Sequence, residues 1–279
     1  MTDCCALSHI LFDYCGCGVF ASGDASEGFD PDDLVNGSEN NWQATGTATV
    51  TVDYDTPQII DAIAIYNVCA SDQTSITVSN DGNIIATFQV TCDGCSCVTL
   101  FKTIDPIEVS SLDFAFQDGS GGTISASNIL AGTSLKVTTL DGWSISVIEP
   151  LANPRRSLAG TRITSCGPRW RELNLRLDLC EADKRELLEQ ELCKGLSLKM
   201  LFVIKEDGCE DTVFLGSPKS LSRFTSQARF NRFSKPLVIE ECNNASVMDS
   251  CKAPIRTAPC GISVGCAMAG CVSAGPAQT

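Results

Sequence analysis

Alternating apolar and polar residues recur in short stretches from about residue 19 to residue 149. Residues 47–54 alternate strictly, and residues 59–68 are β-branched and mostly apolar. The pair Asp81-Gly82 separates two further alternating runs, which is a strong signal for a β-hairpin. Strand signals spaced about 8–14 residues apart, with almost no helical periodicity, are typical of an antiparallel β-sandwich.

The pattern changes after residue 160. Residues 169–179 alternate and predict an amphipathic strand. Residues 180–195 predict a helix, because acidic residues open the segment, leucines form an apolar stripe and Gly195 can form the C-cap. Residues 196–208 predict a buried strand ending in a turn, and two or three more strands follow. This order of elements predicts an α+β unit.

The expected fold class is therefore mainly β, with an N-terminal antiparallel β-sandwich of jelly-roll type and a smaller α+β domain containing one clear helix. We expect the N-terminal arm to be tethered by sulfur chemistry rather than by a core. The expected boundaries are a Cys-rich arm at 1–18, the sandwich at 19–150, a linker at 151–160, the α+β domain at 161–242 and an extended Cys/Gly/Ala-rich tail at 243–279.

Charge divides the chain near residue 150. The formal net charge is −14, but residues 1–150 hold only two basic residues, Lys102 and Lys136, against 20 acidic ones. The remainder carries a small positive charge, and so sharp a shift marks a domain boundary. An acidic half argues against nucleic acid as a partner. The acidic side chains either keep the surface soluble or bind calcium, although residues 30–33 lack EF-hand spacing.

The composition excludes several kinds of chemistry. The chain has one histidine, His9, and no GxSxG motif, so triad hydrolases and multi-histidine metal sites are disfavoured. We expect no enzymatic activity and no cofactor. No run of 18 apolar residues is present, so no membrane insertion is expected.

Cysteine usage points to an oxidising environment, yet the N-terminus lacks the basic region of a secretory signal. A virion component reconciles the two, because it is made in the cytoplasm and released to the extracellular medium. Cys92, Cys95 and Cys97 have three alternative roles. They form disulfides, they stay free thiols, or they bind zinc together with Cys69 or the N-terminal cysteines. The chain has 17 cysteines, so one thiol stays free or pairs between chains. The disulfide candidates are Cys4, Cys5, Cys15, Cys17, Cys69, Cys92, Cys95, Cys97, Cys242, Cys251, Cys260, Cys266 and Cys271.

Two further sets of side chains have alternative interpretations. Trp42 and Trp143 are core anchors or a sugar-stacking platform. A basic cluster after residue 150 is a solvated linker face or a docking site for an acidic neighbour, such as the acidic half of another copy. The cluster consists of Arg155, Arg156, Arg162, Arg169 and Arg171.

The order of these elements resembles two known families. Residues 29–68 followed by 76–82 have the layout of a galactose-binding-like, discoidin-type β-sandwich, in which an NG…W segment precedes an alternating strand, an apolar strand and a strand entering a DG turn. Residues 169–240 are similar to a module that follows such sandwiches in structural proteins of tailed bacteriophages. The resemblance covers roughly residues 20–242 and implies no catalytic residues.

These observations favour a non-enzymatic structural protein of a tailed phage virion, in the tail, neck or baseplate. Its partners would be copies of itself in a ring and neighbouring virion proteins. The alternative is a carbohydrate-binding module that attaches to a host-surface saccharide.

Overall fold

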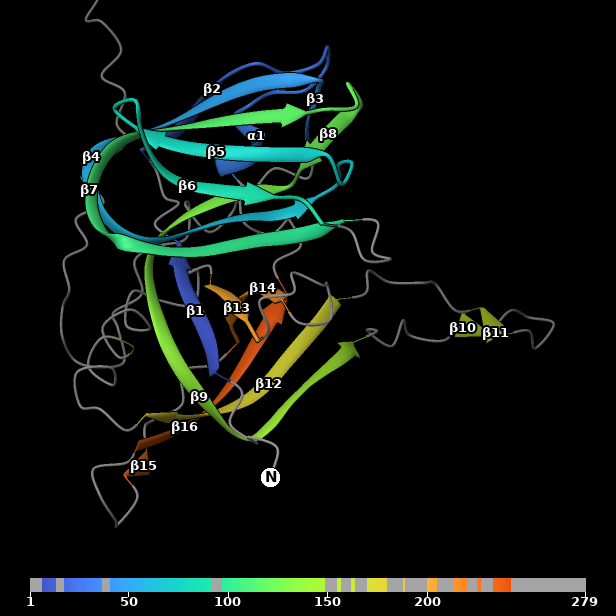
Figure 1. Ribbon diagram of the computed structural model, residues 1–279. Coiled ribbons are helices and arrows are strands. Elements are labelled where there is room, and N and C mark those ends of the chain that lie inside the picture. The colour runs from blue at the N-terminus through green and yellow to red at the C-terminus, as the bar shows by residue number, and fades with distance from the viewer. Residues whose placement is uncertain are drawn as a thin grey trace, which may run out of the picture.

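The computed structural model describes residues 7–13, 18–36, 41–91, 97–148, 155–156, 162–163, 170–179, 188, 200–204, 213–219, 225–226 and 233–241 (Figure 1). The elements are β1 (Leu7–Asp13), β2 (Val19–Gly23), α1 (Asp33–Asn36), β3 (Trp42–Thr45), β4 (Thr47–Val68), β5 (Thr74–Asn80), β6 (Asn83–Gln89), β7 (Val98–Asp118), β8 (Thr123–Ala126), β9 (Asn128–Ile148), β10 (Arg155–Arg156), β11 (Arg162–Ile163), β12 (Trp170–Leu179), β13 (Met200–Val203), β14 (Val213–Pro218), β15 (Thr225–Ser226) and β16 (Phe233–Glu241).

Two long strands build the expected antiparallel β-sandwich. β4 and β7 pair along most of their length and curve together from one layer into the other (Figure 1). In the first layer, residues 47–53 of β4 and 111–117 of β7 join β2, β5 and β6. In the second layer, residues 62–68 of β4 and 98–103 of β7 join the start of β9. We call residues 18–132 the sandwich lobe.

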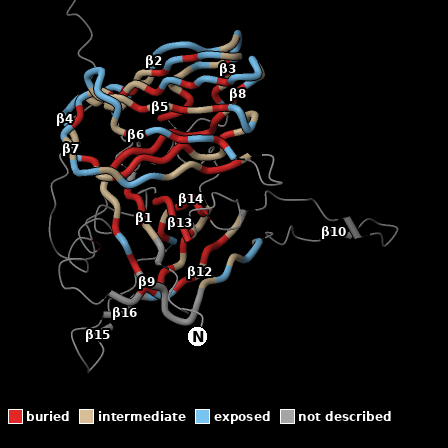
Figure 2. Tube along the Cα trace, viewed as in Figure 1, coloured by how far each residue is buried: buried red, intermediate tan, exposed pale blue. Residues whose placement is uncertain are grey.

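The alternation of the sequence explains which side chains fill this sandwich. Val50 and Phe114 in the first layer and Ile63 and Ile65 in the second are fully buried and belong to one core cluster. Their chain neighbours point outward because successive side chains in a strand face opposite sides. Figure 2 shows buried segments on strands of the sandwich as well as on the strands below it.

The Asp81-Gly82 hairpin is confirmed. β5 and β6 pair on either side of the turn, and Asp81 and Gly82 have φ angles of 50° and 77°. Two positive φ angles in a two-residue loop match the twist of the flanking strands. The strands predicted separately at 47–54 and 59–68 form the single bent strand β4, whose register shifts between Asp53 and Gln58.

Six of the described strands close into a ring. β1 pairs with β13, β13 with β14, β14 with β16, β16 with β12, β12 with β9, and β9 again with β1, all antiparallel. This closed ring of six strands surrounds a core that includes Phe12, Leu175, Phe202, Phe214 and Ile239. We call these six strands, with β9 from residue 133 onward, the ring lobe.

The prediction of an N-terminal arm without a core is wrong for residues 7–13. They form β1, which lies between β9 and β13, and Ile10, Leu11 and Phe12 are fully buried. Backbone hydrogen bonds on both edges and burial of three large side chains hold this strand. The other arm residues that carry the predicted cysteines lie outside the described residues.

A third core joins the two lobes. On β13, Met200 and Phe202 face the interior of the ring, whereas Leu201 and Val203 pack with Ala62, Ala64 and Leu130 of the sandwich lobe. All these side chains are buried, which explains why β13 is apolar at every position. The two lobes therefore share an apolar interface.

The chain passes from the sandwich lobe to the ring lobe within β9, near residue 132, and not near residue 150 where the charge changes. β9 pairs with β4 through residues 128–132 and with β1 and β12 thereafter, so one strand belongs to both lobes. The predicted linker is described only at β10, which pairs with β11. The tail at 243–279 lies outside the described residues.

The described ring lobe is built of strands, and the expected α+β character is not confirmed. Of the predicted helix at 180–195 only Leu188 is described, and it is helical and fully buried in the ring core. Among the described residues, no helix is long and apolar enough to span a membrane.

A buried carboxylate fixes the turn between β7 and β8. Asp118 Oδ1 accepts hydrogen bonds from Ser71 Oγ at 2.7 Å, and from Ser120 N and Ser120 Oγ at 2.8 Å each. These bonds, that from Ser71 foremost, lower the pKa of Asp118. Donors favour the charged carboxylate, so they stabilise the folded state when Asp118 is ionised.

This cluster predicts a pH-dependent loss of stability. Because the pKa of Asp118 is lowered on folding, its contribution is present above the unfolded-state pKa of about 3.9 and is lost as the pH falls through the lower folded-state pKa. The stability difference between wild type and Asp118→Asn should therefore shrink below about pH 4. Urea unfolding from pH 3 to pH 7 measures it, with Ser71→Ala as a partial variant. A difference that is constant with pH would contradict the assignment.

Candidate functional site

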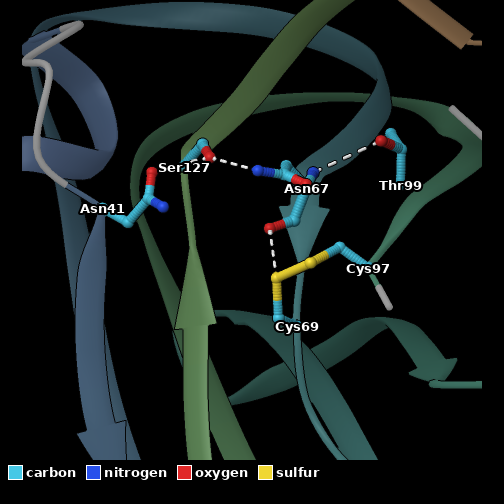
Figure 3. Close-up of a disulfide and its surroundings, with 6 residues drawn as sticks. All are labelled: Asn41, Asn67, Cys69, Cys97, Thr99 and Ser127. Carbon is cyan, nitrogen blue, oxygen red and sulfur yellow. Dashed lines mark hydrogen bonds between the residues drawn. A yellow bond between two sulfur atoms is a disulfide. The ribbon is translucent and has the colours of Figure 1, made fainter. Parts of the chain in front are cut away.

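A disulfide between Cys69 and Cys97 marks one end of the sandwich lobe (Figure 3). Cys69 directly follows β4 and Cys97 directly precedes β7, next to the register pair Val68 and Val98. The disulfide therefore joins two strands that are already neighbours and secures the point where β7 begins.

A network of polar side chains surrounds this disulfide. Asn67 Nδ2 donates to Ser127 Oγ, and Ser127 Oγ donates to Asn41 Oδ1, both at 2.9 Å. Asn67 N donates to Thr99 Oγ1 at 3.3 Å, and Asn67 has a φ of 57°. Asparagine tolerates this left-handed conformation better than most residues. Figure 3 shows Asn67 between Ser127 and Thr99, so the network ties the ends of β3, β4, β7 and β8 together.

Loss of the disulfide should lower stability without changing the fold. Cys69 and Cys97 lie 28 residues apart, and closing a loop of this size restricts the unfolded chain by about 3–4 kcal/mol. We expect Cys69→Ser/Cys97→Ser to lower the unfolding free energy by up to that amount. Thermal unfolding with and without reductant measures it, and the double variant should no longer respond to reductant at this site. An unchanged midpoint would contradict the prediction.

The remaining cysteine candidates are only partly placed. Cys69 and Cys97 are bonded to each other, so neither offers a thiolate to the zinc site considered with Cys92 and Cys95. Among the described residues, no group of His, Cys, Asp and Glu is arranged to hold a metal ion. The candidates outside the described residues are Cys4, Cys5, Cys15, Cys17, Cys92, Cys95, Cys242, Cys251, Cys260, Cys266 and Cys271.

A groove of about 280 Å³ opens beside the disulfide, between β6 in one layer and the start of β7 in the other. Among the described strands, none pairs with the edge of β6 that faces away from β5, or with the edge of residues 98–102 of β7 that faces away from β4. The groove therefore lies on the open side of the sandwich. Its lining residues are Thr87, Phe88, Gln89, Thr91, Val98, Thr99, Leu100, Phe101 and Lys102.

Lys102 spans this groove. Its side chain lies on the same face of β7 as those of Val98 and Leu100. Its Nζ donates a hydrogen bond to Thr87 O on β6 at 3.5 Å. Thr87 and Thr91 are exposed beside it. The groove combines hydroxyl, amide and ammonium donors with apolar side chains, so it offers hydrogen bonds to a polar molecule.

Trp42 is not a stacking platform. Trp42 is fully buried, its ring lies 4.7 Å from that of Phe116, and its Nε1 donates to Asp24 O at 2.8 Å. A saccharide cannot reach a ring that is 0% exposed. Trp143 lies in the ring lobe, where it is half-buried against the core. The prediction that Trp42 anchors the core is the one that fits this structure.

The acidic run at residues 30–33 has a local structural role. Asp32 Oδ1 accepts a hydrogen bond from Ala21 N on the edge strand β2, and Asp30 Oδ1 accepts one from Asp32 N. A side chain that occupies an edge donor blocks pairing with other strands. The carboxylate of Asp32 therefore covers part of a sheet edge, and that of Asp30 holds the turn that carries it.

Arg171 is not available for docking to a neighbour. Its guanidinium pairs with Glu241 at 2.6 Å and lies 5.5 Å from the centre of the Phe214 ring, at the end of the ring core. Nearby, Lys219 pairs with the buried Glu172, and this hydrogen bond raises the pKa of Lys219.

The rest of the predicted basic cluster is not brought together with Arg171 by any described contact. Arg155, Arg156 and Arg162 lie in β10 and β11, whose side chains are not described. Arg169 lies outside the described residues.

Sequence reasoning missed the groove and Lys102. The sequence feature that could have drawn attention to Lys102 is that it is one of two basic residues among the first 150. Its position opposite Thr87 depends on how β7 bends between layers, which periodicity does not reveal.

Comparisons with known proteins give a likeness to carbohydrate-binding modules. No protein-family model and no curated protein matches the sequence. Among solved structures, a family 32 module of Clostridium perfringens NanJ in complex with galactose has a TM-score of 0.34 and 20% identity, covering 42% of this chain and 93% of that one. A Streptococcus pneumoniae fucose-binding module has a TM-score of 0.34 and 12% identity, covering 43% and 94%. At these TM-scores the likeness carries no argument about function.

Proposed function

We propose that the chain is a non-enzymatic saccharide-binding protein whose sandwich lobe holds its ligand in the groove between β6 and β7. The observation that carries this proposal is the groove itself, where Thr87, Thr91 and Lys102 stand exposed beside apolar walls. Hydroxyl and ammonium groups match the alternating donors and acceptors of a sugar, and apolar walls suit its C–H faces.

The absence of catalysis is part of the same proposal. His9 is the only histidine of the chain, and its ring lies 5.3 Å from Phe101, between the lobes. An imidazole packed against a phenyl ring is poorly placed for proton transfer to a ligand in solution. Turnover of any substrate in a glycosidase and esterase panel would contradict this part.

Saccharide binding is tested by titration calorimetry of the full chain against a panel of neutral and acidic oligosaccharides. We expect at least one to bind, and Thr91→Trp, which fills the groove, to weaken its binding at least tenfold. Thr49→Trp is the matched control, because Thr49 is also exposed but lies outside the groove, and the affinity of this variant should stay within twofold of wild type. Failure of every saccharide to bind, or equal affinity of both variants, would contradict the proposal.

A second candidate function is structural: assembly of several copies in a tailed phage virion, with release to the extracellular medium. It is favoured by the opposite charges of the two halves and by Phe20 and Ile84, which are 55% and 69% exposed on the edge strands β2 and β6. Exposed apolar side chains on edge strands suit contacts with other chains. Sedimentation should then show oligomers that dissociate as salt rises, and a monomer at every concentration would contradict assembly.

A further inference from the structure

The groove differs in charge from the lobe that contains it. Residues 1–150 include 20 acidic residues and two basic ones. None of the described residues that line the groove is acidic, and Lys102 is among them. The sandwich lobe therefore places its one basic residue, Lys102, in a groove where none of the described lining residues is a carboxylate.

Lys102 is also held in a way that leaves its ammonium accessible. Its Nζ makes a long hydrogen bond to Thr87 O, at 3.5 Å, and no described carboxylate lies within ion-pair distance of it. An ammonium has three donors, so one carbonyl does not saturate it. The methylene stem starts from the edge of the sandwich core and carries the charge across the opening.

We propose that Lys102 makes the groove selective for an anionic saccharide, whose carboxylate or sulfate would pair with Nζ while its hydroxyl groups contact the threonines. This inference rests on the proposed saccharide-binding function and specifies its ligand class. A charged hydrogen bond is about twice as strong as a neutral one. Acidic side chains elsewhere on the lobe repel the ligand weakly, since salt screens charges beyond about 8 Å under physiological conditions.

The test compares each anionic saccharide with a neutral counterpart. Full-length protein is titrated with tetragalacturonate and its methyl ester, and with sialyllactose and lactose. We expect the anionic member of at least one pair to bind at least tenfold more tightly. Lys102→Gln should remove this preference, Lys102→Arg should keep it, and raising NaCl from 50 to 500 mM should reduce it.

Lys136→Gln is the matched control, because Lys136 is the other basic residue in the first 150 and is exposed on β9, away from the groove. It should leave the preference unchanged. Equal binding of charged and neutral members, or a preference that survives Lys102→Gln, overturns the anionic selectivity while saccharide binding stands. If the wild type binds none of the four ligands, the proposed selectivity is overturned. If it also binds no saccharide of the wider panel, the proposed saccharide-binding function is overturned as well.

Discussion

Removing residues 1–13 is expected to abolish cooperative folding of the ring lobe. β1 pairs along its whole length with β9 and over residues 9–12 with β13, so its loss opens the ring and leaves two strand edges unpaired. Ile10, Leu11 and Phe12 are each fully buried, and each contributes about 1.5–3 kcal/mol by burial alone. This sum is comparable with the whole stability of a typical domain.

The measurement is near-ultraviolet circular dichroism with hydrogen exchange, which reports the two lobes separately. The truncated chain should lose protection in β9, β12 and β13, and a synthetic peptide of residues 1–18 should restore it by pairing as the missing strand. Phe12→Ala is the milder variant, expected to cost about 3–5 kcal/mol. Lys136→Ala, exposed on β9 beside β1, is the control. Unfolding of the truncated chain at the wild-type midpoint would show that the ring does not need β1.

The second large effect is expected at Trp42. Replacement by alanine removes the largest fully buried side chain of the sandwich lobe, its contact with Phe116 and its hydrogen bond to Asp24 O. Phe or Trp to Ala changes in cores cost about 3–5 kcal/mol, and the orphaned carbonyl adds to this. We expect Trp42→Ala to lower the unfolding free energy by at least 3 kcal/mol on that scale.

Chemical denaturation followed by far-ultraviolet circular dichroism measures this change. Trp42→Phe should recover much of the loss, because it keeps the ring contact and gives up only the hydrogen bond. Trp143→Ala is the matched control: Trp143 is half-buried in the other lobe, so its removal should cost less. A loss below about 1 kcal/mol for Trp42→Ala would mean that Trp42 is not a core anchor.

The elements that the sequence predicted well are those determined by neighbours in the chain. The Asp81-Gly82 hairpin depends on two residues that accept positive φ, and the strands of the sandwich follow from strict alternation. The buried strand predicted within residues 196–208 is β13, and its residues 200–203 are apolar at every position because a core lies on each face.

The features that the sequence did not reveal depend on residues that are far apart along the chain. Residues 7–13 are too few to show a period, and their strand exists because β9 and β13 lie on either side of it. Cys69 could have paired with many other cysteines, and spacing alone does not choose among so many connectivities. Arg171 resembled a docking residue because its partners, Glu241 and Phe214, come much later in the chain.

The position of β1 also constrains how the chain is made. Ile10 lies opposite Phe202, about 190 residues further along. At about 5–20 residues per second, roughly 10–40 s separate the synthesis of these two partners. During that interval β1 has at most β9 beside it, and its other edge stays available to other chains. Closure of the ring is then a late event with high contact order, so newly made chains are exposed to aggregation until residues 200–203 arrive. Halves expressed separately should be insoluble, whereas the full chain should gain yield from slower, colder expression.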